Sequence, residues 1–418
     1  MLKQDAGSAA SATALLEEYR AGSSFFFSSP QRTLLAKGEW ARLPDYEGPD
    51  GLKSLPRRAA ELLASTGQSG HGTSVVVGAV PFDHTKPAQL VVPMTIQWAG
   101  PLGFDPGVQA EQHPASAFEM RAVPAPAEYE NGVNRILARL EQGDLRKVVL
   151  ARSLYLTSSA AVDIQQLLRN LARHNTRGFT FAANLSTGGD HKSLRSAAAG
   201  SEGPRTLIGA SPELLVAKTG PYIKANPLAG SAARSDDPYE DERRAASLLA
   251  SPKDRHEHAV VVEAVAEALR PYCKKLDVPL EPSLVQTNTM WHLSTEINGE
   301  LADPSTSSLE LAAALHPTPA VCGTPTDLAR AVIQEMEPFE RGFFTGMVGW
   351  CDANGDGEWA VTIRCAEVEG RVIRLFAGAG IVPGSSPEAE LLETSAKFRT
   401  MLLAMGLNQQ QMAGRKEA

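Results

Sequence analysis

Two pairs of acidic residues have the spacing that could build a metal site. Asp254 and Glu257 lie three residues apart, and Glu390 and Glu393 repeat this spacing near the C-terminal end. An i, i+3 pair projects from one face of a helix. If the two helices converge, the clustered carboxylates need a cation to stay ionised, and oxygen-only ligands favour a hard ion such as Mg²⁺. Taken singly, such a pair is more often a solvated group that interacts favourably with the helix dipole.

A lysine and a glutamate are candidates for proton transfer. Alternation along the predicted strand 146–157 places Lys147 on the same face as Val149 and Ala151. An amine that is desolvated on an inward face loses its proton more readily and can act as a base. The alternative is an exposed lysine on an edge strand. Glu213 follows Pro212, whose fixed backbone suits a positioned acid and an ordinary turn equally.

Segments of small residues could let a ligand approach the backbone closely. One is 226–231, which ends in Gly230 and Ser231, and the other is Ala-Gly-Ala-Gly at 377–380. The second lacks the GxGxxG spacing of a dinucleotide site. The segment 352–357 resembles the start of a calcium-binding EF-hand loop, but its twelfth position is Ile363 instead of glutamate. Asn-Gly and Asp-Gly between two apolar runs predict a hairpin turn there.

The elements that must position these residues are a mixture of strands and helices. The pattern favours an α+β protein with mostly antiparallel sheets, built as a single domain over 1–418. Residues 1–12 are expected to be disordered, and 99–126 to be an irregular connection. Strands are predicted at 73–80, 89–92, 146–157, 179–185, 214–218, 343–350, 359–368 and 371–377, and helices at 133–140, 163–173, 238–250, 253–272, 308–315, 326–335 and 388–405.

Composition narrows the class of protein. The 418 residues are 43% hydrophobic, and 40 basic against 48 acidic side chains give a net charge of −8. This charge argues against nucleic-acid and membrane-surface binding, although a small anionic substrate remains compatible. The four cysteines form no CxxC pair and are predicted to be reduced thiols. No stretch resembles a signal peptide or approaches the ~18 apolar residues of a membrane span, so we expect a cytoplasmic protein.

Eight short motifs, taken in order, resemble those of a known family. They are KVVLAR at 147–152, SPEL at 211–214, PLAGS at 227–231, KDRHEH at 253–258, WHL at 291–293, HPTP at 316–319, TIR at 362–364 and AGAGIVP at 377–383. Together they resemble the chorismate-utilising enzymes, and within these the isochorismate synthases of the catecholate-siderophore type. The motif-bearing catalytic part spans about 127–407. The resemblance implies a single α+β domain with two large antiparallel sheets flanked by helices.

The resemblance also implies an activity and a role for each matching residue. The expected reaction is the Mg²⁺-dependent isomerisation of chorismate to isochorismate, in which water adds at C2 and the C4 hydroxyl leaves. Lys147 matches the general base and Glu213 the general acid. Glu257 and Glu393 match the Mg²⁺ ligands, with Asp254 and Glu390 reaching the ion through water. Positions that match substrate contacts are Gly230, Ser231, Ala320, Arg364, Gly378 and Lys397.

His292 is a further candidate to line the site, although a hydrogen-bonded core histidine is the alternative. Arg364 can pair with a carboxylate through two hydrogen bonds. Lys397 falls four residues after Glu393, so the two share a helical face. These cations and the metal ion would attract a dianionic substrate into an acidic protein.

Some relatives are disfavoured by single positions. Ala229 stands where aminodeoxychorismate synthases have a nucleophilic lysine, and Lys147 argues for water over ammonia as the nucleophile. No glutamine amidotransferase segment is present, no amidotransferase partner is expected, and the family is expected to be monomeric. Two alternatives remain open: a salicylate synthase, which goes on to eliminate pyruvate, and a catalytically silent protein that binds chorismate or metal. Siderophore and quinone biosynthesis both remain open as the destination of the product.

Overall fold

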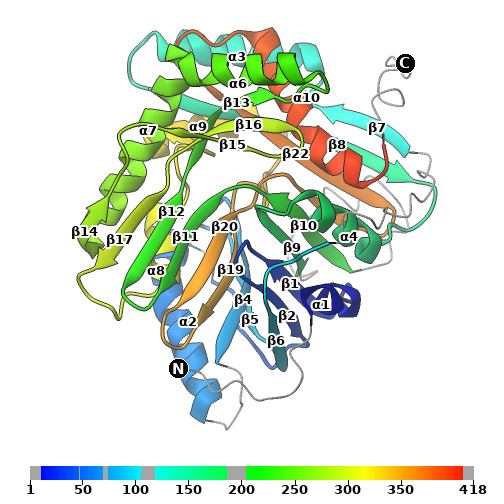
Figure 1. Ribbon diagram of the computed structural model, residues 1–418, viewed down its shortest axis with the longest axis vertical. Coiled ribbons are helices and arrows are strands. Elements are labelled where there is room, and N and C mark those ends of the chain that lie inside the picture. Colours follow the sequence, from blue (N-terminus) through cyan, green and yellow to red (C-terminus); the bar gives the residue numbers. More distant parts are fainter. Residues whose placement is uncertain (1–10, 47, 69–73, 105–117, 186–203, 408–418) are drawn as a thin grey trace.

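The computed structural model describes residues 11–46, 48–68, 74–104, 118–185 and 204–407. Within these ranges the strands form two large sheets and one small sheet, and helices cover their faces (Figure 1). Neighbouring strands are antiparallel in all three sheets. The predicted α+β class with two antiparallel sheets is confirmed. The third, three-stranded sheet was not predicted.

The first large sheet runs in the order β18-β8-β22-β21-β10-β9-β1-β2-β6, and β7 also pairs with β8. Its long strand β8 is buried along most of its length. The bounds are β1 Ser24–Ser28, β2 Thr33–Lys37, β6 Thr95–Ala99, β7 Phe118–Val123, β8 Lys147–Ser158, β9 Phe179–Leu185, β10 Arg205–Ser211, β18 Gly323–Thr324, β21 Cys365–Glu369 and β22 Val372–Ile381.

The second large sheet runs in the order β14-β17-β12-β11-β20-β19-β4-β5-β3, and the small sheet in the order β13-β16-β15. Strands from both halves of the chain contribute to each large sheet. The bounds are β3 Ala41–Arg42, β4 Val75–Val80, β5 Gln89–Val92, β11 Leu214–Thr219, β12 Tyr222–Asn226, β13 Leu228–Ala233, β14 Cys273–Asp277, β15 Ser283–Gln286, β16 Met290–Ser294, β17 Ile297–Leu301, β19 Met347–Asp352 and β20 Gly357–Val361.

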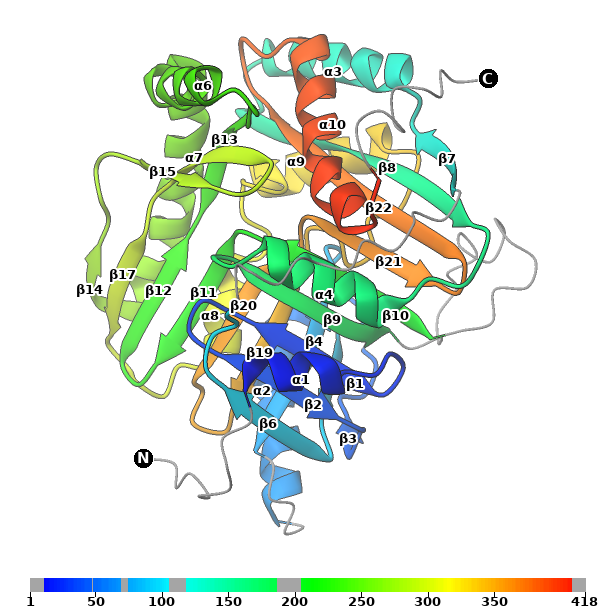
Figure 2. The same cartoon turned by 45° about the vertical axis from the view of Figure 1, so that its right-hand side comes forward.

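The helices pack on the sheets as their apolar faces require. Figure 2 shows α1 and α4 on one face of the first sheet, and α10 beside β22. No helix among the described residues is long and apolar enough to cross a membrane. The bounds are α1 Ala12–Glu18, α2 Gly51–Gln68, α3 Pro126–Leu140, α4 Ile164–His174, α6 Pro238–Ala250, α7 Pro252–Leu269, α8 Ser308–Leu315, α9 Thr326–Met336 and α10 Pro387–Ala404, with a short 3₁₀ turn at Arg270–Tyr272.

The two helices that carry the acidic pairs begin in the same way. Ser251 caps α7 by accepting a hydrogen bond from a backbone N–H, and Ser386 does the same for α10. A proline follows each serine at the first helical position, where its missing N–H costs nothing. These two local signals fix where each helix starts, and thereby place both acidic pairs in the first two helical turns.

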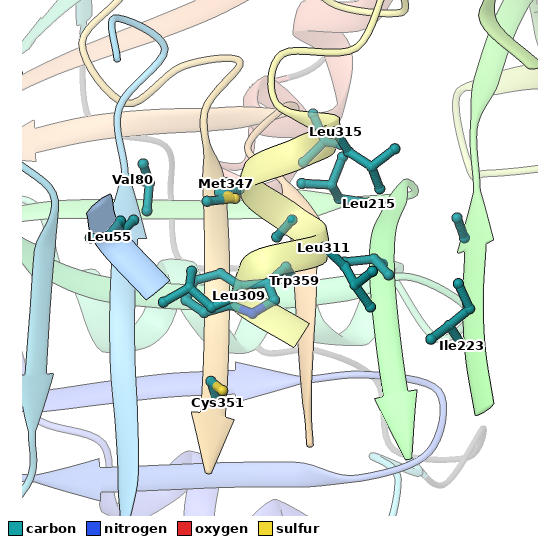
Figure 3. Packing of buried hydrophobic residues seen from close by; sticks show 14 of the residues in the cluster. Leu55, Val80, Leu215, Ile223, Leu309, Leu311, Leu315, Met347, Cys351 and Trp359 are labelled. Atoms are coloured by element: carbon teal, nitrogen blue, oxygen red, sulfur yellow. The ribbon is translucent and has the colours of Figure 1, made fainter. Parts of the chain in front are cut away.

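A large core lies between the second sheet and the helices α2 and α8. Figure 3 shows Leu309, Leu311 and Leu315 of α8 packed over Met347 and Trp359 of the sheet. All five side chains are buried, and each contributes on the order of 1.5–3 kcal/mol through removal of apolar surface from water. The packing of α8 therefore fixes the position of the segment that follows this helix, and that segment leads to the candidate site.

The structure differs from the predicted strands where the chain crosses between sheets. The run 359–368 was predicted as one strand, but it breaks into β20 of the second sheet and β21 of the first. Arg364 sits at the break with a left-handed backbone, φ 50°. The predicted strand 343–350 begins only at Met347, after Thr345 with φ 60°. In both places an apolar pattern continues through a backbone turn that alternation cannot reveal.

Two further predictions need correction near the N-terminus. The connection 99–126 contains the strand β7, which pairs with β8. Ser11 caps α1 and Ala12 begins it, so these residues are ordered, whereas 1–10 lie outside the described residues. The predicted hairpin at 352–357 joins β19 and β20, and Asp352 accepts backbone hydrogen bonds within that turn. All four cysteines are described, and none forms a disulfide.

Candidate active site

Most of the predicted site residues meet around one cavity, which is lined by β8 and β22 of the first large sheet, β13 and β16 of the small sheet, the helices α7 and α10, and connecting segments. Ten of the thirteen contribute to its lining. Lys147, Asp254 and Glu390 do not, but Lys147 contacts a lining residue, Glu257. Helix α7 and helix α10 both contact strand β13, which brings the two acidic pairs to the same region. The lining residues among those predicted are Glu213, Gly230, Ser231, Glu257, His292, Ala320, Arg364, Gly378, Glu393 and Lys397.

Lys147 is the first residue of β8, and its side chain is fully buried. Its side-chain nitrogen lies 2.8 Å from Oε1 of Glu257. The pair fits because Gly380 stands opposite on β22: a Cβ there would lie 2.2 Å from that oxygen and 2.8 Å from Cε of Lys147. The alternation of β8 therefore points the lysine inward, and the glycine leaves the space in which it meets α7.

His258 fixes the start of α7 against the small sheet. Burial lowers the pKa of His258 to about 4, so the imidazole is neutral at pH 7. Its Nδ1 donates to the carbonyl of Ala229 at 3.2 Å, and its Nε2 accepts from the hydroxyl of Thr295 at 2.7 Å. The next residue of β13, Gly230, has φ 76°, and a Cβ there would lie 3.1 Å from Cβ of Asp254. The helix and the glycine loop are thus held in close contact.

Helix α10 contributes Glu390, Glu393 and Lys397 to the same region. Nζ of Lys397 lies 2.6 Å from Oε1 of Glu393 and donates to the carbonyl of Gly378 at 2.7 Å. Ser231 donates to the same glutamate oxygen at 2.9 Å. Burial opposes ionisation of Glu393, but Lys397 and its other donors outweigh it and hold the pKa below its ordinary value. Glu393 is therefore an anion at neutral pH.

Glu390 is paired with a lysine that the sequence did not single out. Nζ of Lys253 lies 2.8 Å from Oε1 of Glu390, whereas the second carboxylate oxygen is buried without a partner in the described part of the chain. Burial, and then the charge of Glu393, raise the pKa of Glu390. Lys253 lies inside the KDRHEH motif next to Asp254, so its position was the available signal.

The carboxylates fit a hard divalent ion. The donors are oxygens only, and three of the four carboxylates contact a lysine nitrogen. Clustered carboxylates stay ionised together only with positive charge nearby. No three His, Cys, Asp or Glu side chains form a ready metal site among the described residues. Mg²⁺ does not need one, because it commonly takes one or two carboxylates and fills its other positions with water and substrate oxygens. Glu257 and Glu393, which both line the cavity, satisfy that requirement.

Arg364 places a buried positive charge on the segment that connects β20 of the second sheet to β21 of the first. Its left-handed backbone costs on the order of 1–3 kcal/mol, a strain that is typically found at functional positions. Burial lowers the pKa of Arg364 to about 10, so the guanidinium stays charged at neutral pH. Its Nη2 donates to Nε2 of His292 at 3.2 Å, while Nη1 is buried without a partner within the described ranges. That donor is available to an anionic ligand in the cavity.

His292 is neutral in this arrangement. Burial, followed by the charges of Arg364 and Lys397, lowers its pKa well below the ordinary value. A neutral imidazole can accept the hydrogen bond from Arg364, which holds the guanidinium in place. The structure thus combines both interpretations of His292, because it is hydrogen-bonded and also lines the cavity.

Glu213 is the buried acid of the cavity. It is 2% exposed, and its Oε1 accepts a hydrogen bond from the backbone N–H of Leu228 at 3.5 Å. Burial raises the pKa of Glu213 to about 7, although Lys147, Lys397 and Arg364 each lower it. A carboxyl group with this pKa is partly protonated at neutral pH and can donate a proton.

Comparison with known proteins identifies the family. A family model described as chorismate binding enzyme matches residues 104–406. The chain belongs to the chorismate-binding enzyme family. The match covers α3, β8 and every element that contributes to the cavity lining.

Individual relatives of this chorismate-binding enzyme are similar over nearly their whole length. Isochorismate synthase DhbC of Bacillus subtilis is 57% identical over 98% of this chain and 100% of its own. The vibriobactin-specific isochorismate synthase of Vibrio cholerae is 41% identical over 94% of each chain. Among solved structures, DhbC of Bacillus anthracis superimposes with a TM-score of 0.87 at 54% identity, covering 95% of this chain and 100% of that one.

Proposed function

We propose that this chorismate-binding enzyme is an isochorismate synthase, an isomerase that converts chorismate to isochorismate. The observation that supports it best is a buried carboxyl group, Glu213, in the lining of a cavity whose lining residue Glu257 contacts the fully buried Lys147. The names of its relatives agree with this activity. The vibriobactin-specific relative favours siderophore biosynthesis as the destination of the product. The enzyme would act as a cytoplasmic monomer without an amidotransferase partner.

Lys147 and Glu213 each carry out one proton transfer. The amine of Lys147 accepts a proton from water while the water oxygen forms a bond to C2 of chorismate. Both ring double bonds shift, the C4–O bond breaks, and Glu213 gives its proton to the departing hydroxyl, which leaves as water. One water is consumed and one is released, so the net reaction is an isomerisation. Base and acid can act together because burial keeps Glu213 partly protonated at the pH where it works.

Binding of the substrate requires positive charge, because chorismate carries two carboxylates. Arg364 and Lys397 supply two cations, and the partnerless Nη1 of Arg364 suits a carboxylate oxygen. We assign Glu257 and Glu393 as ligands of Mg²⁺, with Asp254 and Glu390 acting through water. When bound, the ion supplies charge for a carboxylate of the ring. The backbones of Gly230 and Gly378 and the side chains of Ser231, His292 and Ala320 complete the walls.

The first prediction concerns the product. Incubation of the protein with chorismate and Mg²⁺, followed by chromatographic separation, is expected to yield isochorismate. Salicylate together with pyruvate would replace the proposal with a salicylate synthase. Unchanged chorismate would contradict any catalytic role and leave a silent binder. Omission of Mg²⁺ is expected to stop conversion, since the acidic cluster lacks the charge that holds the dianion.

A second prediction concerns Gly380. The variant Gly380→Ala places a methyl group where Glu257 and Lys147 meet, and a displacement of about 1 Å at a reacting group lowers the rate by about 10²-fold. We expect kcat to fall by that order. Gly299→Ala is a matched control, because its Cβ would be crowded by Ile223 and Cys273 far from the cavity. The control should lose stability and keep its kcat; an equal kcat in both variants would contradict the role of Gly380.

A further inference from the structure

Among the described residues, no strand pairs with the part of the β8 edge that follows Val148 and precedes Ser153. Strand β18 pairs with β8 only at Lys147 and Val148, and β7 pairs with it only from Ser153 onward. Two buried side chains occupy the gap. Oε1 of Glu337 accepts from the N–H of Ala151, and Nη2 of Arg341 donates to the carbonyl of Val149, both at 2.8 Å. An ion pair thus takes the place of a missing strand.

Arg341 also contacts groups that lie outside the β8 edge. Nη1 donates to the carbonyl of Val321 at 2.8 Å and to the hydroxyl of Thr345 at 3.2 Å. Nε and Nη2 donate to the two oxygens of Glu337 at 2.8 and 2.5 Å. All five N–H groups of the guanidinium are therefore used. The ring of Phe82 lies 4.6 Å from the guanidinium carbon and adds a cation–π contact.

The three groups that Arg341 joins belong to three different walls of the cavity. Val149 lies on the strand of Lys147, Val321 follows α8, and Thr345 precedes β19; all three line the cavity, whereas Arg341 does not. We propose that Arg341, held by Glu337, is a positioning residue that sets the distance between the base strand and the opposite wall. This inference rests on the proposed function for Lys147. Lysine cannot replace it, because an ammonium group has three donors and no planar fork.

The test compares Arg341→Lys with a matched variant, Arg205→Lys. Arg205 is also buried and paired with a glutamate, Glu367, at 2.7 Å, but it does not line this cavity. We expect Arg341→Lys to lower kcat at least about tenfold, with a smaller change in KM, because misplaced reacting groups slow chemistry more than binding. Arg205→Lys should lower Tm and keep kcat. A kcat of Arg341→Lys equal to that of the control would overturn the proposal.

A second variant covers the case in which Arg341→Lys fails to fold. The double variant Glu337→Met and Arg341→Met removes both buried charges at similar volume, an exchange that proteins often tolerate. It is expected to fold and to show the same loss of kcat; a normal kcat would again overturn the proposal.

Hydrogen exchange provides a readout that does not depend on turnover. The amide of Ala151 should exchange faster in the double variant than in the wild type, and unchanged exchange there would also contradict the positioning role. If the wild type converts no chorismate, the proposed function fails, while the exchange result still decides whether Arg341 and Glu337 hold this strand.

Discussion

Replacement of Lys147 by alanine is expected to abolish turnover. The variant lacks the amine that accepts the proton from water, and general base catalysis contributes about 10²–10⁴-fold to a rate. Chorismate should still bind in the presence of Mg²⁺, because Arg364 and Lys397 are unchanged. The measurement is product formation at saturating chorismate, together with calorimetric binding of chorismate. Binding without turnover is the expected result.

A matched lysine separates the chemical role from stability. Lys147→Ala leaves Glu257 buried without its partner, and breaking a buried pair of this kind costs on the order of 3–5 kcal/mol of folding free energy. Lys218 is equally buried and paired with Asp356 at 2.9 Å, but it lies in the second sheet away from the cavity. Lys218→Ala should lower Tm and retain turnover. A Lys147→Ala variant with a near-normal rate would remove the assignment of the base.

Glu213→Gln is expected to lose activity. At alkaline pH, its free energy of unfolding is expected to rise relative to that of the wild type. Glutamine cannot donate the proton that the departing hydroxyl requires. In the wild type, the folded state raises the pKa of Glu213 to about 7 through burial, so its contribution to stability is present below about pH 4.5 and is lost as the pH rises through 7. That loss amounts to about 3 kcal/mol. A glutamine at this position does not titrate, so the variant does not lose this stability as the pH rises.

Chemical denaturation of both proteins at about pH 4 and about pH 8 measures this difference. The free energy of unfolding should shift in favour of the variant between the two pH values. Wild-type turnover should also decline above about pH 7, as the acid loses its proton. Glu358→Gln is the control, because burial raises the pKa of Glu358 too, but it does not line the cavity. A Glu213→Gln variant that turns over normally would contradict its role as the acid.

Local signals in the sequence predicted the elements that carry the acidic pairs. The helix predicted at 253–272 starts one residue after α7 begins and runs three residues past its end, and the last helix was placed within one residue at each end. The i, i+3 spacing and the serine–proline starts are properties of neighbouring residues, so they can be read from the sequence. Alternation along β8 grouped Lys147 with Val149 and Ala151 but left open whether that face points inward, and the structure buries the lysine.

Long-range contacts could not be predicted in this way. The break at Arg364 depends on the chain leaving one sheet for the other, and an apolar pattern continues through it. The pairing of Lys253 with Glu390 joins residues 137 positions apart, and that of Ala151 with Glu337 joins residues 186 apart. The N-terminal strand β1 belongs to the first large sheet and β4 to the second, although their sequences carry no motif of the family.

Reaction in ¹⁸O-enriched water distinguishes attack by solvent water from migration of the substrate's own hydroxyl group. In the proposed mechanism, Lys147 activates a solvent water against C2 while Glu213 releases the C4 hydroxyl. The isochorismate formed should carry a single ¹⁸O atom, located by mass spectrometry in the C2 hydroxyl. Isochorismate without the label would mean that the hydroxyl group migrates within the substrate, and it would contradict the roles of both residues.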